Sequence, residues 1–387
     1  MSAGDLELVA IDVRPGAAHE TQSGLQAMRP RIYGAWRRPR AGAGAHAEGT
    51  AGARPPVGAI VMHPTSNFMG HYLVAPLAER GIACMGLNSR YVNNDSVLLM
   101  ERVIQDLGAG VRFLREQGAR RVVLIGNSGG AALSAFYQAQ AERLTAVQTP
   151  DGTPSGLSPQ DLPPVDGLVL HAAHAGRSRL MAEWIDPALT DEHDPLAVDA
   201  TLDVYDPANG PPYADAFLSR FRAAQAARRA RLDGWAWSTL QRLRADRNGP
   251  QDRAFVVHRT HADPRFLDLS LDSNERKAGS LWGDPRQVNH GPNAMGRFTT
   301  LTAYLSQWSA RSQADGPTNL ARTSVPVLHA THCADQSVFP STVATWMEAG
   351  GSRIRNIDLP GADHYLAGRP DLVERLADEI AGFALHA

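Results

Sequence analysis

Short apolar runs alternate with segments of helical periodicity along much of the chain. The apolar runs, which read as buried strands, lie at 57–62, 82–87, 121–125 and 167–172. The segments between them, which read as helices, lie at 70–80, 96–117 and 129–141. Strands that alternate with helices in this way predict right-handed βαβ units and a parallel sheet covered on both faces.

The same alternation returns near the end of the chain, with strands at 325–329 and 354–359 and helices at 341–349 and 371–384. Two shorter strands, 6–13 and 31–36, precede the first buried one. A run rich in Gly, Ala and Pro over 40–56 predicts a loop. We find no internal repeat.

The interval 176–321 interrupts the alternation and is too long for a loop inside a compact domain. Helical patterns such as 214–244 indicate that it is structured and mainly helical. We therefore expect an α/β fold with a mostly parallel, doubly wound sheet. Its core would be formed by 1–175 and 322–387, with 176–321 inserted between them as a cap.

Composition narrows the class of protein. Of the 387 residues, 43% are apolar, enough for a large core, and the formal net charge of -2 indicates neither a nucleic-acid surface nor an acidic tail. The two cysteines, Cys84 and Cys333, lie in strand-like stretches and give no disulfide framework. With neither a signal-peptide pattern nor a membrane-spanning stretch, the sequence predicts a cytoplasmic protein without a membrane partner, compatible with a homo-oligomer.

The strongest chemical signal is Gly126-Asn127-Ser128-Gly129-Gly130, between an apolar strand and a helix of small residues. A serine lifted off a sheet by a tight strand-to-helix turn has strained backbone angles, and side chains two residues away would clash with the turn. Glycine on both sides removes the clash. The helix that follows places its positive end where an oxyanion would develop. The pattern favours Ser128 as a nucleophile over a purely structural turn.

A serine nucleophile needs a base, and an acid to orient that base. His364 follows the last predicted strand, whose end would lie at the same sheet edge as Ser128. Asp335 follows the preceding strand. Asp363 is the alternative acid, but a residue adjacent to the histidine cannot easily reach behind its ring. The order Ser128, Asp335, His364 predicts a catalytic triad.

The loops of Ser128, Asp335 and His364 fall at the places along the chain where the α/β-hydrolase superfamily has its nucleophile, acid and base. The chain resembles this superfamily over roughly 57–174 and 322–387. The resemblance implies an oxyanion hole made by the N–H of Gly129 and one from the loop that begins at His63. That loop usually reads His-Gly, but here Pro64 follows His63. Proline has no N–H, so Thr65 is the expected second donor, with Ser66 as the alternative.

Several further residues are candidates for the substrate pocket: Ser66, His171, Trp184, Trp282 and Tyr365. Tryptophans of the insertion are expected to form mostly the core of the cap, with one or two facing the pocket. His258 and His261 could suggest a metal site, but no further ligands occur at useful spacing, so a polar loop is the favoured interpretation.

The residues together predict a serine hydrolase, similar to a carboxylesterase, that cleaves an ester or thioester of small to medium size. The expected mechanism uses an acyl-enzyme intermediate and needs neither cofactor nor metal. An acyltransferase would use the same triad, and a non-catalytic binding protein on the same fold is a second alternative. A haloalkane dehalogenase is excluded, because it needs a carboxylate at the position of Ser128.

Overall fold

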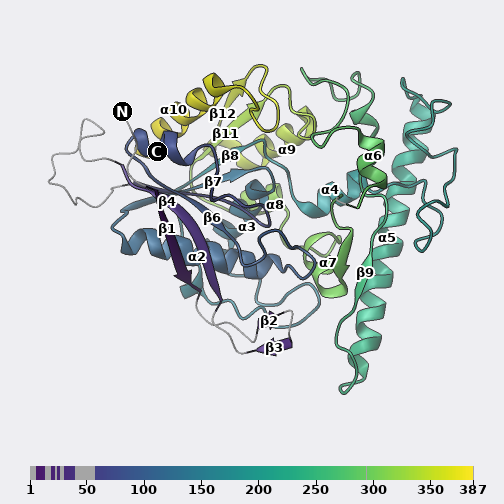
Figure 1. The fold of residues 1–387 in the computed structure, drawn as a ribbon, viewed down its shortest axis with the longest axis horizontal. Coiled ribbons are helices and arrows are strands. Elements are labelled where there is room, and N and C mark those ends of the chain that lie inside the picture. Colours follow the sequence, from purple (N-terminus) through teal and green to yellow (C-terminus); the bar gives the residue numbers. More distant parts are fainter. Residues whose placement is uncertain are drawn as a thin grey trace.

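A computed structural model of the chain describes residues 6–13, 19–21, 24–26, 30–39, 57–292 and 294–386. The loop expected over 40–56 lies outside the described residues. The described chain is built around an eight-stranded sheet with the order β1-β4-β6-β5-β7-β8-β11-β12 (Figure 1).

Six neighbouring strands of this sheet run parallel: β5 (Val57–His63), β6 (Ala83–Asn88), β7 (Arg121–Asn127), β8 (Gly167–His171), β11 (Val327–His332) and β12 (Ile354–Leu359). β1 (Leu6–Asp12) and β4 (Arg31–Arg37) add an antiparallel edge. This arrangement confirms the expected mostly parallel sheet. A small hairpin of β2 (His19–Thr21) and β3 (Gly24–Gln26) is too short for the sequence pattern to have predicted it.

Helices cover both faces of the sheet, which confirms the doubly wound arrangement (Figure 1). One face carries α2 (Met100–Glu116), α3 (Gly129–Glu142), α8 (Gly316–Leu320) and α9 (Pro340–Gly350). The other face carries α1 (Val74–Glu79) and α10 (Pro370–His386). Neighbouring positions of β7 alternate between the two cores, with Leu124 in one and Ile125 in the other.

Two helices are shorter than the sequence predicted, because the chain before each of them forms turns. The helix expected over 70–80 begins at Val74, and the N–H of His71 bonds instead to the carbonyl of Phe68 at 3.0 Å. The helix expected over 96–117 begins at Met100, after a loop in which Asn94 accepts hydrogen bonds from Ser96.

The segment 176–321, expected as an inserted cap and called the insertion below, contains α4 (Arg177–Trp184), the long α5 (Asp215–Ala245), α6 (Pro285–His290) and α7 (Leu301–Gln307), together with the antiparallel pair β9 (Ala254–Val256) and β10 (Phe298–Thr300). The short α8 ends this segment and packs against the sheet. Helices are its main regular elements, but 185–214 forms neither helix nor strand beyond an isolated bridge. A buried ion pair of 2.6 Å between Arg259 and Asp186 holds this irregular part.

Across the described chain, single 3-10 turns occur at Pro159–Asp161, Pro264–Phe266 and Gly351–Arg353. None of the described helices is long and apolar enough to cross a membrane.

Candidate active site

Ser128 lies in the turn between β7 and α3, at a φ of 56° and a ψ of -126°. This positive φ is strained for a residue with a side chain. A Cβ on Gly126 would come within 2.5 Å of the Cα of Ala131, and one on Gly130 within 2.2 Å of the carbonyl oxygen of Met62. Only glycine fits at either position, because the atoms in the way belong to the backbone. The turn holds the Ser128 side chain above the sheet at the start of α3.

Three side chains from distant parts of the chain form a hydrogen-bonded row at this sheet edge. The Ser128 hydroxyl lies 3.0 Å from Nε2 of His364, and Nδ1 of His364 lies 2.8 Å from Oδ2 of Asp335. Ser128 follows β7, Asp335 follows β11 and His364 follows β12. Parallel strands end at the same edge, so these loops meet.

Asp335 is wholly buried, and its other oxygen, Oδ1, accepts three hydrogen bonds. The donors are the N–H of Ser337 at 2.8 Å, the N–H of Val338 at 3.0 Å and the hydroxyl of Ser337 at 3.0 Å. Burial alone would raise the pKa of Asp335, but the adjacent His364 ring holds it well below its ordinary value. A carboxylate in this state is suited to orient and stabilise a histidine that gains a proton.

Asp363, the alternative acid, serves a different purpose. Its Oδ1 accepts hydrogen bonds from the N–H groups of Tyr365 at 3.1 Å and Ala367 at 3.2 Å. Asp363 therefore shapes the loop after His364, whereas Asp335 is the carboxylate in contact with the ring.

The two expected oxyanion donors differ in their surroundings. Gly129 is the first residue of α3, so its N–H has no partner within the helix. The N–H of Thr65 instead donates to Nδ1 of His63 at 3.2 Å, and that of Ser66, the alternative, donates to the same atom at 3.0 Å. The N–H groups of Thr65 and Ser66 are therefore both directed toward the His63 ring.

A cavity of about 560 Å³ opens above Ser128 and brings the core and the insertion together. Four of the candidate pocket residues line it: Ser66, Trp184, Trp282 and Tyr365. Leu180, Met295 and Trp308 add apolar surface from the insertion. Residues of the segment 176–321 thus form part of the wall around the serine.

His171 is the candidate that the structure places outside the cavity. The side chain is wholly buried at the end of β8, where Nδ1 lies 3.3 Å from Nδ2 of Asn127 and the ring stacks on His332. His171 pairs with Asn127, the residue before Ser128, in the parallel ladder, and its ring contacts the Asn127 side chain. His171 supports the turn and cannot contact a substrate in this arrangement.

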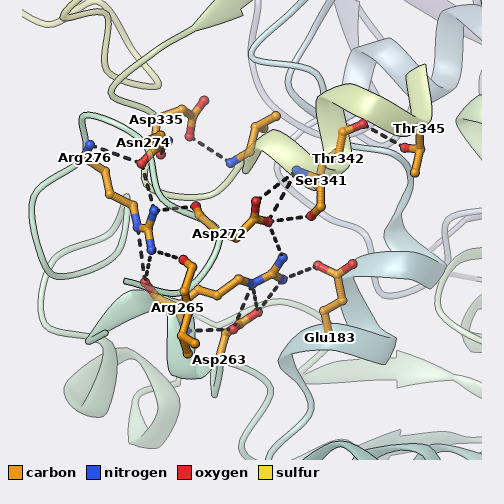
Figure 2. A network of polar contacts seen from close by, with 12 residues as sticks. Glu183, Asp263, Arg265, Asp272, Asn274, Arg276, Asp335, Ser341, Thr342 and Thr345 are labelled. Carbon is orange, nitrogen blue, oxygen red and sulfur yellow. Dashed lines mark hydrogen bonds and ion pairs between the residues drawn. The ribbon is translucent and has the colours of Figure 1, made fainter. Parts of the chain in front are cut away.

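The structure also reveals contacts that the sequence did not predict. A segment of the insertion around Asp272, Asn274 and Glu275 lies against the loops of Asp335 and His364. Figure 2 shows Asn274 of this segment beside Asp335. The Glu275 N–H donates to the carbonyl of Cys333 at 2.9 Å, and its carboxylate accepts from the N–H of Gly361 at 2.6 Å. These residues carry no motif, and their partners lie about 60 or more positions away, so no local pattern signals them.

Charged residues anchor this segment both to the rest of the cap, through Arg265 and Asp272, and to α9 of the core. Arg265 bonds to Asp263 and to Glu183 at 2.6 Å each, and Asp272 accepts a bond of 3.1 Å from the N–H of Ser341 at the start of α9 (Figure 2). Within the part of the chain that the structure describes, no group of three or more His, Cys, Asp or Glu side chains is arranged to hold a metal ion.

The sequence matches no family model, and no curated protein matches it. Among solved structures, the α/β hydrolase GrgF from Penicillium sp. sh18 superposes with a TM-score of 0.51 at 12% identity, over 99% of this chain and 100% of that one. A carboxyl esterase from Bacillus coagulans has a TM-score of 0.49 at 11% identity, over 98% and 97% of the two chains. Est1E from Butyrivibrio proteoclasticus has a TM-score of 0.48 at 11% identity, over 98% of this chain and 99% of that one. The likeness to GrgF establishes the fold.

Proposed function

We propose that this chain, which has the fold of the α/β hydrolases, is a serine hydrolase that cleaves carboxylic esters or thioesters through an acyl-enzyme. The observation that carries the proposal is the row of hydrogen bonds from Ser128 through His364 to Asp335, of 3.0 and 2.8 Å. A hydroxyl, an imidazole and a buried carboxylate in this order form the arrangement that activates serine in acyl transfer.

In the first half-reaction, Nε2 of His364 takes the proton of Ser128 while the Oγ attacks the substrate carbonyl. The carbonyl π electrons move to oxygen, and the N–H of Gly129 at the start of α3 stabilises the negative charge. The tetrahedral intermediate then collapses. His364 gives its proton to the leaving alcohol or thiol, and the acyl group stays on Ser128 as an ester.

The second half-reaction repeats these steps with water as the nucleophile. His364 takes a proton from water, whose oxygen attacks the acyl-enzyme, and returns the proton to the Ser128 Oγ as the acid is released. Asp335 keeps the ring in one orientation and stabilises its positive form in both halves.

The cavity supports a substrate of small to medium size. Its volume of about 560 Å³ falls within the range of roughly 300–1,000 Å³ that is typical of small-molecule sites. Trp184, Trp308 and Met295 offer apolar walls to an acyl chain, and Ser66 adds a polar group. These apolar walls belong to the insertion, whereas Ser128 and its partners belong to the core. We therefore propose that substrate selectivity lies mainly in the insertion.

The test is a panel of p-nitrophenyl esters of increasing acyl length, assayed with the wild type and with Ser128→Ala. We expect the wild type to release p-nitrophenol from short and medium chains and Ser128→Ala to be inactive. A wild type that is inactive on every ester, or a Ser128→Ala protein that keeps the activity, would overturn the proposal. Adding an alcohol separates hydrolysis from acyl transfer, because a transferase would form a new ester in place of the free acid.

A further inference from the structure

His63, the last residue of β5, has a hydrogen-bonding state that the structure determines. Its Nδ1 accepts from the backbone N–H groups of Thr65 at 3.2 Å and Ser66 at 3.0 Å. A backbone N–H can only donate, so Nδ1 carries no proton. Burial and the positive charge of Arg177 hold the pKa of His63 well below its ordinary value, so the ring is neutral. A neutral imidazole with a bare Nδ1 carries its single proton on Nε2.

The Nε2 of His63 lies beside the nucleophile turn. A Cβ on Gly129 would be only 2.8 Å from this nitrogen, and the ring lines the same cavity as Ser128. Among the described residues, Nε2 of His63 makes no hydrogen bond, while Nδ1 makes two. The ring therefore presents a free N–H donor next to the N–H of Gly129, at the start of α3.

The geometry points to the Nε2–H of His63 as the second donor of the oxyanion hole, in the place expected for the N–H of Thr65. This inference rests on the proposed function and names a further catalytic residue for it. Pro64 has no N–H, and the N–H groups of Thr65 and Ser66 are both engaged by the ring itself. The loop thus orients an imidazole toward the site, while the amides of Thr65 and Ser66 are directed to the ring.

Neighbouring contacts hold this donor in one orientation before substrate arrives. The two backbone N–H groups orient the ring, and Phe68 packs beside it with ring centroids 5.4 Å apart. Arg177 holds the loop through a bond of 2.8 Å from Nη2 to the Thr65 hydroxyl. A donor fixed in advance stabilises the developing oxyanion without reorganisation, which is the basis of electrostatic preorganisation.

Two substitutions test the two ring nitrogens of His63 separately: the donor Nε2–H and the acceptor Nδ1. In His63→Asn the short amide can still accept from Thr65 and Ser66 but leaves no donor at the position of Nε2. In His63→Gln the longer amide can place an N–H near that position but loses the acceptor. We expect kcat of His63→Asn to fall by about 10² to 10³ with KM within about threefold, and His63→Gln to lose clearly less. Phenylboronic acid, which forms a tetrahedral adduct on serine, should bind His63→Asn more weakly by a similar factor.

The outcomes distinguish the two proposals. If kcat and boronate inhibition of a folded His63→Asn stay within about threefold of wild type, His63 is not a donor, whereas an inactive wild type that fluorophosphonate does not label refutes the serine hydrolase itself. A His63→Gln protein as impaired as His63→Asn also overturns the inference, because it indicates a structural role for the ring.

A measurement on the wild type keeps the test open if His63→Asn does not fold. In protein labelled with ¹⁵N-histidine, with His63→Gln to assign the signals, we expect a protonated Nε2 and a bare Nδ1 at neutral pH. The Nε2–H signal should shift when phenylboronic acid binds. A proton on Nδ1, or a signal that boronate leaves unchanged, overturns the inference.

Discussion

The side-chain amide of Asn274 donates a hydrogen bond of 2.9 Å to the backbone carbonyl of Asp335 (Figure 2). This bond joins the inserted segment to the loop that carries Asp335, the proposed acid of the triad. Glu275, the next residue, bonds to the backbone of Cys333 and of Gly361. The insertion therefore supports both the Asp335 loop and the loop that leads to His364, in addition to lining the cavity.

We predict that Asn274→Ala lowers both stability and kcat. The substitution leaves the Asp335 carbonyl without this partner, which typically costs about 1–3 kcal/mol for a buried acceptor. Chemical denaturation and ester hydrolysis measure the two effects. Asn248→Ala, at an exposed position of the same insertion, is the matched control and should change neither. If Asn274→Ala behaves like this control, the insertion does not position the acid loop.

Ser128 should react rapidly with a fluorophosphonate, because only an activated serine does so. Mass spectrometry of the labelled protein should find the adduct on the peptide that contains Ser128 and none in Ser128→Ala. Ser66 is a second serine in the cavity and provides the control, since Ser66→Ala should label normally. An adduct on Ser66 in the wild type would contradict the assignment of the nucleophile.

The two neighbouring carboxylates should differ sharply in their effect on activity. Asp335→Asn places an amide against Nδ1 of His364 and favours the wrong tautomer of the ring, so we expect kcat to fall by about 10⁴. Asp363→Asn keeps an oxygen that can accept from the N–H groups of Tyr365 and Ala367, so its kcat should change little. Steady-state kinetics on one p-nitrophenyl ester compares them, and the reverse ranking would assign the acid to Asp363.

Local sequence patterns were sufficient to predict most of the fold. Most of the parallel strands and the turn around Ser128 are predictable, because a buried strand is a short apolar run and the turn permits only glycine at Gly126 and Gly130. Chain order also narrowed the search for the base and the acid, since the loops after consecutive parallel strands meet at one edge.

Residues whose surroundings depend on tertiary contacts could not be predicted in this way. Nothing in the sequence shows that the ring of His63 engages the N–H of Thr65, or that His171 turns under the sheet edge instead of into the cavity. Asn274 is a further case, because its partner Asp335 lies 61 positions away. Hydrophobic periodicity places elements and faces, but the direction of a polar side chain in a loop depends on neighbours that are remote in sequence.

Trp184 and Trp282, two of the tryptophans that line the cavity, should respond differently to truncation. Trp184 is 1% exposed and packs against Phe266 and His261, so Trp184→Ala should cost about 3–5 kcal/mol of stability. Trp282 is 42% exposed, and Trp282→Ala should leave stability nearly unchanged while it raises KM for longer acyl chains. The ester panel and chemical denaturation separate the effects. An unchanged chain-length profile in Trp282→Ala would exclude this side chain from the substrate pocket.

Acidification below about pH 6.5 should destabilise the fold, because several histidines are buried in their neutral form. Burial lowers the pKa of His71 and His329 to about 4, and that of His174 and His261 to about 3. In the unfolded chain a histidine titrates near pH 6.5, at about its reference value. Below that pH the unfolded state binds more protons than the folded state, so the free energy of unfolding falls as pH falls.

The stability that these four histidines contribute is present in full above about pH 6.5 and is lost progressively toward about pH 3 to 4. Each one that stays neutral in the fold costs about 1.4 kcal/mol per pH unit in this window. Glu101 acts in the opposite direction, because burial raises its pKa to about 7, but it is a single group. We therefore expect the free energy of unfolding, measured with urea, to decrease steeply between about pH 6.5 and 4.5.

His261→Phe isolates one of these histidines. Neither ring nitrogen of His261 has a hydrogen-bond partner among the described residues, and the ring stacks on Phe266 with centroids 4.6 Å apart. Phenylalanine can keep this stacking and has no group to protonate in the unfolded state. The variant should therefore lose stability less steeply than the wild type, by about 1.4 kcal/mol per pH unit below pH 6.5. Equal slopes for the two proteins would mean that the neutral His261 does not contribute to acid sensitivity.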